Sequence, residues 1–108
     1  MSLKIKSLRA FERELKRLSK RYSSIKKDFR LLLESLLQNP KQGLSLGKDL
    51  YKIRMAISSK SQGKSGGARV VTCIKIENET IFLIAIYDKS DCENITDDEL
   101  RERLKEIN

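Results

Sequence analysis

The chain has 108 residues, of which 39% are hydrophobic and 35% are charged, with a single proline and no histidine. This length and composition predict one domain spanning residues 1–108 with a modest core, and they exclude a disordered chain. The net charge is +8, but residues 1–75 hold nineteen Lys and Arg against five Asp and Glu, whereas residues 76–108 hold four against ten. Such a basic body favours a polyanionic partner, such as a nucleic acid, over a small neutral metabolite.

No segment of the sequence predicts insertion into a membrane. The longest apolar run, Ile81–Tyr87, is far shorter than the roughly 20 residues that a membrane-spanning helix needs. Lys4, Lys6 and Arg9 interrupt any apolar signal sequence at the start of the chain. We therefore expect a cytoplasmic protein without a membrane partner.

The missing histidines narrow the possible chemistry. Because Cys73 and Cys92 show no metal-ligand spacing either, a Cys/His zinc site is excluded, and both thiols are expected to be reduced. No metal and no other cofactor is expected. The usual general base near neutral pH is absent, so any proton transfer would fall to a carboxylate, a lysine or a tyrosine.

The first part of the chain predicts a short strand followed by two helices. Residues 3–6 alternate between apolar and basic side chains, and Ser7 is a candidate N-cap. Apolar residues then recur at the spacing of an amphipathic helix, at Leu8, Phe11, Leu15, Leu18 and Tyr22. A second helix begins at Ser23 or Ser24 and ends at Asn39-Pro40, with one face formed by Ile25, Phe29, Leu32, Leu33, Leu36 and Leu37. The short connector predicts an antiparallel helical hairpin.

Three strands are predicted next. Residues 50–57 alternate, with Tyr51, Ile53, Met55 and Ile57 on one face and Leu50, Lys52, Arg54 and Ala56 on the other. Residues 68–77 form a second strand, and residues 81–87, which are apolar on both faces, form a strand inside the sheet. Together these segments predict an antiparallel meander.

The final element is a helix that begins after Thr96. Thr96 and Glu99 match a capping box, and Ile95 and Leu100 occupy the two positions of a hydrophobic staple. A narrow apolar stripe follows at Leu100, Leu104 and Ile107. The fold class is therefore α+β, with an N-terminal helical hairpin and a C-terminal helix packed on one face of a small, mostly antiparallel, four-stranded sheet.

The glycine-rich segment 63–67 superficially resembles a phosphate-binding P-loop. It fails that pattern because Ser58 stands where the first glycine belongs, and because a strand follows in place of a helix. Nucleoside triphosphate binding is therefore rejected. What remains is a loop over residues 58–67 whose glycines let the backbone approach an anion closely, or a plain flexible hairpin loop.

Basic side chains on the predicted strands and loop are the candidate functional residues. Arg54 and Arg69 are predicted to lie on adjacent strands, where both could bind one phosphate. Alternatively, they could be ordinary surface arginines. Lys52 shares the face of Arg54. Tyr87 could stack on a base, shuttle a proton or simply be a half-buried aromatic, and Lys89 could neutralise charge that develops on a phosphate.

Three motifs resemble the RelE/ParE toxin superfamily, and most closely its HigB/RelE-like branch. These motifs are Tyr51-Lys52-Ile53-Arg54, then 63–70 (GKSGGARV), then 86–90 (IYDKS), and they match the pattern KIR…GKxGGxR…IYxK in order and spacing. The resemblance covers essentially the whole chain. It implies a RelE-like fold and the toxin half of a type II toxin–antitoxin pair.

The resemblance also implies an activity and a site. Many such toxins are metal-independent endoribonucleases that cut messenger RNA, often on the ribosome, through attack of the ribose 2′-hydroxyl on the adjacent phosphate, and so inhibit translation. The implied catalytic residues are Arg54, Arg69, Tyr87 and Lys89, and the implied RNA-binding residues are Lys52, Lys60, Lys64 and Ser65. The implied partners are messenger RNA, the ribosome and a cognate antitoxin, with operator DNA bound only through the antitoxin.

The chain departs from the family pattern at the general base. Members of the RelE branch carry a C-terminal tyrosine in that role, whereas this region offers Leu100, Leu104 and Ile107. Tyr87 would have to serve, or catalysis would depend on charge stabilisation by the basic residues. The alternatives are a ParE-like protein that inhibits DNA gyrase without being an enzyme, and a degenerate member that only binds antitoxin or nucleic acid.

Overall fold

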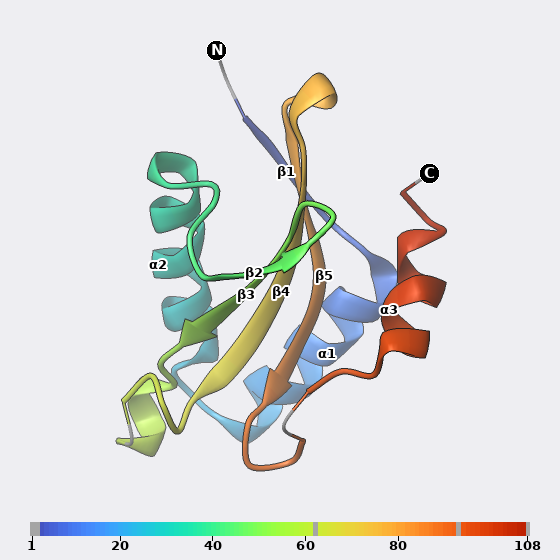
Figure 1. The fold of residues 1–108 in the computed structure, drawn as a ribbon. Coiled ribbons are helices and arrows are strands. Elements are labelled where there is room, and N and C mark those ends of the chain that lie inside the picture. The colour runs from blue at the N-terminus through green and yellow to red at the C-terminus, as the bar shows by residue number, and fades with distance from the viewer. Residues whose placement is uncertain (1–2, 62, 93, 108) are drawn as a thin grey trace.

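The computed structural model describes residues 3–61, 63–92 and 94–107, which form three helices and five strands (Figure 1). The helices are α1 (Arg9–Arg21), α2 (Ile25–Gln38) and α3 (Asp97–Leu104). The strands are β1 (Lys4–Ser7), β2 (Leu44–Gly47), β3 (Leu50–Met55), β4 (Ala68–Lys75) and β5 (Thr80–Asp88). Within these ranges, no helix combines the length and the apolar character that crossing a bilayer requires.

The strands form one sheet in the order β1-β5-β4-β3-β2. β1 is parallel to β5, and the other neighbours are antiparallel, so the predicted meander and the interior position of residues 81–87 are confirmed. The expected count of four strands is one too low, because β2 pairs with β3 at the edge of the sheet. The sequence of β2 alternates two leucines with small residues, a short strand signal that was overlooked, and all four of its residues are exposed, with Leu44 at 62% and Leu46 at 41%.

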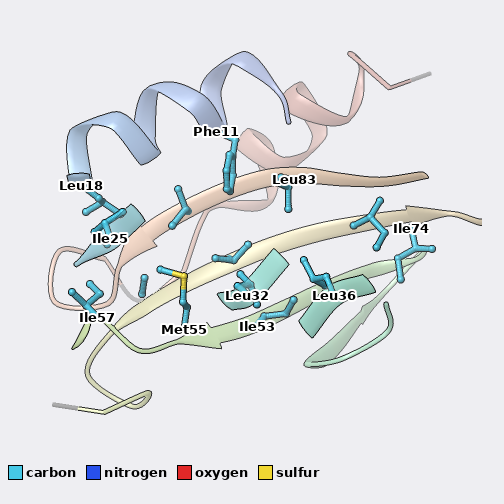
Figure 2. Close-up of a cluster of buried hydrophobic side chains, with 14 residues drawn as sticks. Phe11, Leu18, Ile25, Leu32, Leu36, Ile53, Met55, Ile57, Ile74 and Leu83 are labelled. Atoms are coloured by element: carbon cyan, nitrogen blue, oxygen red, sulfur yellow. The ribbon is translucent and has the colours of Figure 1, made fainter. Parts of the chain in front are cut away.

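One face of the sheet is covered by α1 and α2. Figure 2 shows the apolar side chains that fill this layer, among them Phe11 and Leu18 of α1, Leu32 and Leu36 of α2, and Ile53 and Met55 of β3. Burial of each such side chain contributes about 1.5–3 kcal/mol to folding. Within the predicted apolar face of α2, Leu37 is the exception, since it is 53% exposed.

The opposite face of the sheet is covered by α3, so the expectation that all helices pack on one face is wrong. Successive β4 side chains point to opposite faces, and those of Val71 and Cys73 contribute to a second apolar cluster. Leu100 and Leu104 of α3 pack against this cluster. The reason is that β4 is buried along nearly its whole length on both faces, and a narrow helical stripe does not specify which face it covers.

The two expected caps behave differently. Thr96 accepts a hydrogen bond from the Glu99 amide (3.2 Å), which confirms it as the N-cap of α3. The prediction for Ser7 is wrong, because Ser7 ends β1 and α1 begins at Arg9, after Leu8. The Ser7 hydroxyl donates instead to the carboxylate of Glu12 (3.0 Å), while buried Leu8 joins the α3 side of the sheet.

Candidate functional site

The pairing of β3, β4 and β5 aligns three of the predicted site residues in one row across the sheet. Arg54 lies opposite Arg69, and Arg69 lies opposite Tyr87. Directly paired residues have their Cβ atoms about 5 Å apart on the same face. Lys52 lies two residues along β3 and therefore shares that face, which is the face that α3 partly covers.

A cleft of about 690 Å³ opens beside this row. Five of its lining residues are cationic: Lys52, Arg54, Lys64, Arg69 and Lys89. The other lining residues are Gln42, Gly43, Leu44, Ile53 and Asn94, so the described lining contains no Asp or Glu. We call this cleft the basic cleft. Like charges gathered without a counter-ion favour an anionic ligand, since the ligand relieves their mutual repulsion.

Arg69 forms part of the wall of the basic cleft and also holds its loop. Only 5% of the residue is exposed. Its guanidinium donates to the carbonyl oxygens of Lys64 (2.9 Å), Ser65 (3.0 Å) and Ala68 (3.1 Å), and no carboxylate in the described residues pairs with it. A buried charge balanced only by carbonyl dipoles is costly, and a bound phosphate would reduce that cost.

The other cations differ in their exposure to solvent and in their hydrogen bonds. Arg54, Lys64 and Lys89 are exposed and line the basic cleft. Lys52 is half-buried, and its ammonium donates to the side-chain oxygen of Asn94 (2.7 Å). Ser65 contributes a backbone carbonyl to Arg69, but it does not line the basic cleft.

Lys60 is the predicted RNA-binding residue that the structure places elsewhere. Its ammonium donates to the carboxylate of Asp88 (3.0 Å) and to the hydroxyl of Ser90 (3.3 Å), and it lies over the ring of Tyr22. Its side chain is only 11% exposed. Lys60 is therefore held in a structural ion pair and does not line the basic cleft.

Tyr87 lies in a hollow of about 510 Å³ between the sheet and α3. This hollow shares Lys52 and Asn94 with the basic cleft, so the two spaces adjoin. Burial raises the pKa of the Tyr87 phenol, and neither a hydrogen bond from the Ile95 backbone nor the charge of Arg69 offsets the effect. Because the phenol stays protonated at neutral pH, it is suited to donate a hydrogen bond and poorly suited to accept a proton.

Sequence reasoning missed Asp88, the buried carboxylate between Tyr87 and Lys89. Asp88 accepts hydrogen bonds from the Tyr22 hydroxyl (2.5 Å), the Ser90 amide and hydroxyl (3.0 and 2.7 Å) and the Lys60 ammonium. Burial alone would raise the pKa of Asp88, but these donors outweigh it and hold the pKa far below its usual range. The available signal was strand alternation, which turns Asp88 inward when Tyr87 faces α3.

The low pKa of Asp88 predicts a specific acid dependence of stability. A carboxylate whose folded pKa is depressed stabilises the protein above its unfolded pKa of about 3.9, and that contribution is lost as the pH falls toward the folded value. The charged or titratable groups that face it are Arg21, itself bound to Asp91, together with Tyr22 and Lys60. Asp88→Asn should therefore lower the free energy of unfolding by about 2–3 kcal/mol at neutral pH.

This deficit should shrink as the pH is lowered from about 5 to about 2, which urea unfolding at a series of pH values would measure. Asp98→Asn is the matched control, because the Asp98 side chain is 89% exposed. If the loss of unfolding free energy in Asp88→Asn stayed constant over this pH range, the depressed pKa of Asp88 would be contradicted.

A second buried carboxylate, Asp28 of α2, fixes the start of the loop. It accepts hydrogen bonds from the amide of Ser58 (2.9 Å), from the hydroxyl of Ser58 and from the hydroxyl of Ser24 (2.7 Å). The loop that follows β3 is therefore anchored at Ser58 by Asp28 and near its end by Arg69.

The described residues include no group of three His, Cys, Asp or Glu side chains that could hold a metal ion. Cys73 is buried and Cys92 is exposed, and neither forms a disulfide. The chemistry that this site can supply from its own side chains is therefore the binding and stabilisation of negative charge.

Comparison with known proteins gives a family match over almost the whole chain. The model of the family described as the RelE toxin of the RelE/RelB toxin–antitoxin system matches residues 9–107, which run from α1 to just beyond α3.

Solved structures show the same fold. A double mutant of the E. coli toxin RelE in the free state is 22% identical, with a TM-score of 0.62 and 100% of both chains covered. RelE in the intact E. coli RelBE toxin–antitoxin complex is 20% identical, with a TM-score of 0.62, covering 81% of this chain and 96% of that one. A conserved hypothetical protein from Helicobacter pylori is 22% identical, with a TM-score of 0.50, covering 82% and 97%.

Proposed function

The chain belongs to the RelE family, the toxins of RelE/RelB toxin–antitoxin systems, and we propose that it is an endoribonuclease that cuts messenger RNA and so inhibits translation. The observation that carries this proposal is the basic cleft, where five cationic side chains meet without a carboxylate among the described lining residues. An RNA phosphodiester supplies the negative charge that the lining of this cleft lacks. The flanking phosphates extend the attraction beyond the bond that is cut.

The proposed reaction needs no metal. The ribose 2′-oxygen forms a bond to the adjacent phosphorus and loses its proton, while the bond from phosphorus to the 5′-oxygen breaks and that oxygen gains a proton. The products are a 2′,3′-cyclic phosphate and a 5′-hydroxyl. Arg54, Lys64 and Lys89, which line the basic cleft, would stabilise the extra negative charge of the pentacovalent transition state.

The remaining residues of the site are proposed to bind and to orient the RNA. Arg69 shapes the loop through its carbonyl contacts and presents its buried charge to the phosphate. Lys52 would contact the phosphate backbone of the RNA, and Ser65, whose carbonyl binds Arg69, would help to hold the loop beside it. The raised pKa of Tyr87 argues against the role of general base and favours contact with a flanking base in the hollow beneath α3.

The proposed partners are an antitoxin, messenger RNA and the ribosome. The E. coli RelBE structure is a toxin–antitoxin complex, which supports a cognate antitoxin for this chain. An acidic antitoxin segment that folds on contact would neutralise the basic cleft. Operator DNA would be bound through the antitoxin, and cleavage would take place on translating ribosomes.

A cell-free translation reaction with a defined transcript tests the proposal. We expect cleavage within the coding sequence, with a cyclic phosphate on the upstream fragment. A transcript that carries a single 2′-deoxy nucleotide at the mapped site should remain intact there, because the nucleophile is missing. Equal cleavage of the deoxy transcript, or an intact ribose transcript, would overturn the proposal.

Binding without cleavage is the second candidate function. It is favoured by the raised pKa of Tyr87, because burial keeps the phenol protonated near neutral pH and so disfavours its use as a general base. In that case the transcript would stay intact while RNA or antitoxin still bound. Inhibition of DNA supercoiling with intact transcripts would instead support gyrase inhibition.

A further inference from the structure

The side chains around Asp88 connect three segments of the chain. We define the Asp88 cluster as Arg21, Tyr22, Lys60, Asp88 and Ser90. Tyr22 follows α1, Lys60 ends the 3₁₀ turn Ser58–Lys60, and Ser90 lies in the turn after β5. Arg21 completes the cluster at 3.8 Å from Asp88 and at 2.7 Å from Asp91.

The Asp88 cluster adjoins both segments that bring lysines to the basic cleft. On one side, the backbone carbonyl of Asp88 accepts hydrogen bonds from the amides of Asp91 (3.0 Å) and Cys92 (3.3 Å), which defines the turn that carries Lys89. On the other side, Lys60 lies four residues before Lys64. The amide of Lys89 donates to the carbonyl of Gly67 (3.0 Å), so the turn and the end of the loop are joined directly.

None of the Asp88 cluster residues lines the basic cleft. Asp88 pairs with Ala68 in the sheet and points to the face of α1, whereas its neighbour Tyr87 points to the face of α3. The cluster therefore makes no direct contact with the basic cleft, and it is joined to the cleft through the backbone of the two segments that carry Lys64 and Lys89.

From this geometry we propose that Asp88 is a positioning residue, whose buried carboxylate holds the loop with Lys64 and the turn with Lys89 in a fixed arrangement around the bound phosphate. The inference rests on the proposed cleavage of RNA at the basic cleft. Burying a carboxylate is costly, and an apolar side chain would end the strand without that cost. A charged acceptor, however, can hold donors from three separate segments in one geometry.

The test uses Asp88→Asn and Tyr22→Phe in the full chain. Tyr22→Phe removes only the hydroxyl that donates to Asp88, and it keeps the ring in place. Both variants should cut RNA about 10- to 100-fold more slowly in single-turnover reactions, because displacement of a charged group by about 1 Å has an effect of that size. Their affinity for the uncleavable 2′-deoxy RNA should stay within about threefold of wild type, because the cations are still present.

Glu14→Gln is the matched control. Glu14 pairs with Arg103 (2.8 Å) in a partly shielded ion pair, with side chains 20% and 15% exposed, and it accepts a hydrogen bond from the Ile86 amide of β5 (3.3 Å) but shares no hydrogen bond with a residue of the Asp88 cluster. It should lower stability without slowing cleavage. The positioning role is overturned if Asp88→Asn and Tyr22→Phe cleave at the wild-type rate, or if Glu14→Gln slows cleavage equally at equal stability.

Hydrogen exchange separates this inference from the proposed function. Without RNA, the amides of Lys89 and Ser90 should exchange at least about tenfold faster in Asp88→Asn than in wild type, since Ser90 loses its charged acceptor. If the wild-type protein cuts no RNA, the proposed nuclease function is rejected. The hydrogen-exchange rates then test by themselves whether Asp88 holds the two segments in place. Unchanged exchange overturns the positioning role and leaves the nuclease standing.

Discussion

Replacing Arg69 by alanine is expected to reduce RNA cleavage by about three orders of magnitude or more, because one substitution removes a charge and releases the loop. The guanidinium donates to the carbonyls of Lys64, Ser65 and Ala68, and all three would lose this donor, the Ala68 carbonyl at a buried position. Single-turnover cleavage of a defined transcript, with the folded fraction checked by circular dichroism, measures the effect.

Arg69→Lys separates charge from geometry. A lysine ammonium keeps the positive charge, but it cannot reproduce the planar guanidinium group, which donates to three carbonyl oxygens at once. We expect a loss of about 100-fold for Arg69→Lys, and of about tenfold or less for Arg54→Lys, since Arg54 is exposed. Equal rates for Arg69→Lys and wild type would show that the carbonyl contacts do not matter.

The row of cations could be predicted because it follows from local pattern. Alternation over residues 50–57 assigned Lys52 and Arg54 to one face, and the face assignment is confirmed. A loop that joins two consecutive strands makes them antiparallel neighbours, which brings Arg54 opposite Arg69. Each step depends only on residues close in sequence.

The parts that sequence reasoning missed depend on distant contacts. β2 carries only a short alternation of two exposed leucines, Leu44 and Leu46, and is defined by its backbone pairing with β3. The face of the sheet that α3 covers is decided by the burial of β4 on both sides. Asp88 and Lys60 carry no local signal of their pairing, because 28 residues separate them and Tyr22 is a further 38 residues away.

These omissions share a consequence for function. The family resemblance implied that Lys60 binds RNA, whereas in the structure its ammonium pairs with the buried carboxylate of Asp88. Charge counts therefore indicate a basic surface, but they do not show which of its cations already pair with carboxylates inside the protein. The distinction between Lys60 and Lys64 needs three-dimensional contacts.

Gly67→Ala should be among the most destabilising single changes in the chain. A Cβ atom at this position would lie 2.3 Å from the carbonyl oxygen of Met55 and 2.9 Å from the amide nitrogen of Ile57. Both neighbours are backbone atoms, so the end of β3 and the start of β4 would have to separate. We expect a loss of roughly 3 kcal/mol or more in the free energy of unfolding, measured by urea denaturation.

Gly63→Ala is the control from the same loop. Gly63 has a φ of +65°, but a Cβ atom there would meet no atom within 4 Å. Only the strain of a left-handed alanine remains, which costs about 1 kcal/mol. The carbonyl oxygen of Gly67 also accepts a hydrogen bond from the amide of Lys89. Gly67→Ala should therefore impair cleavage even where the protein stays folded, whereas Gly63→Ala should not. Equal destabilisation by the two changes would contradict the close approach of β3 and β4 at Gly67.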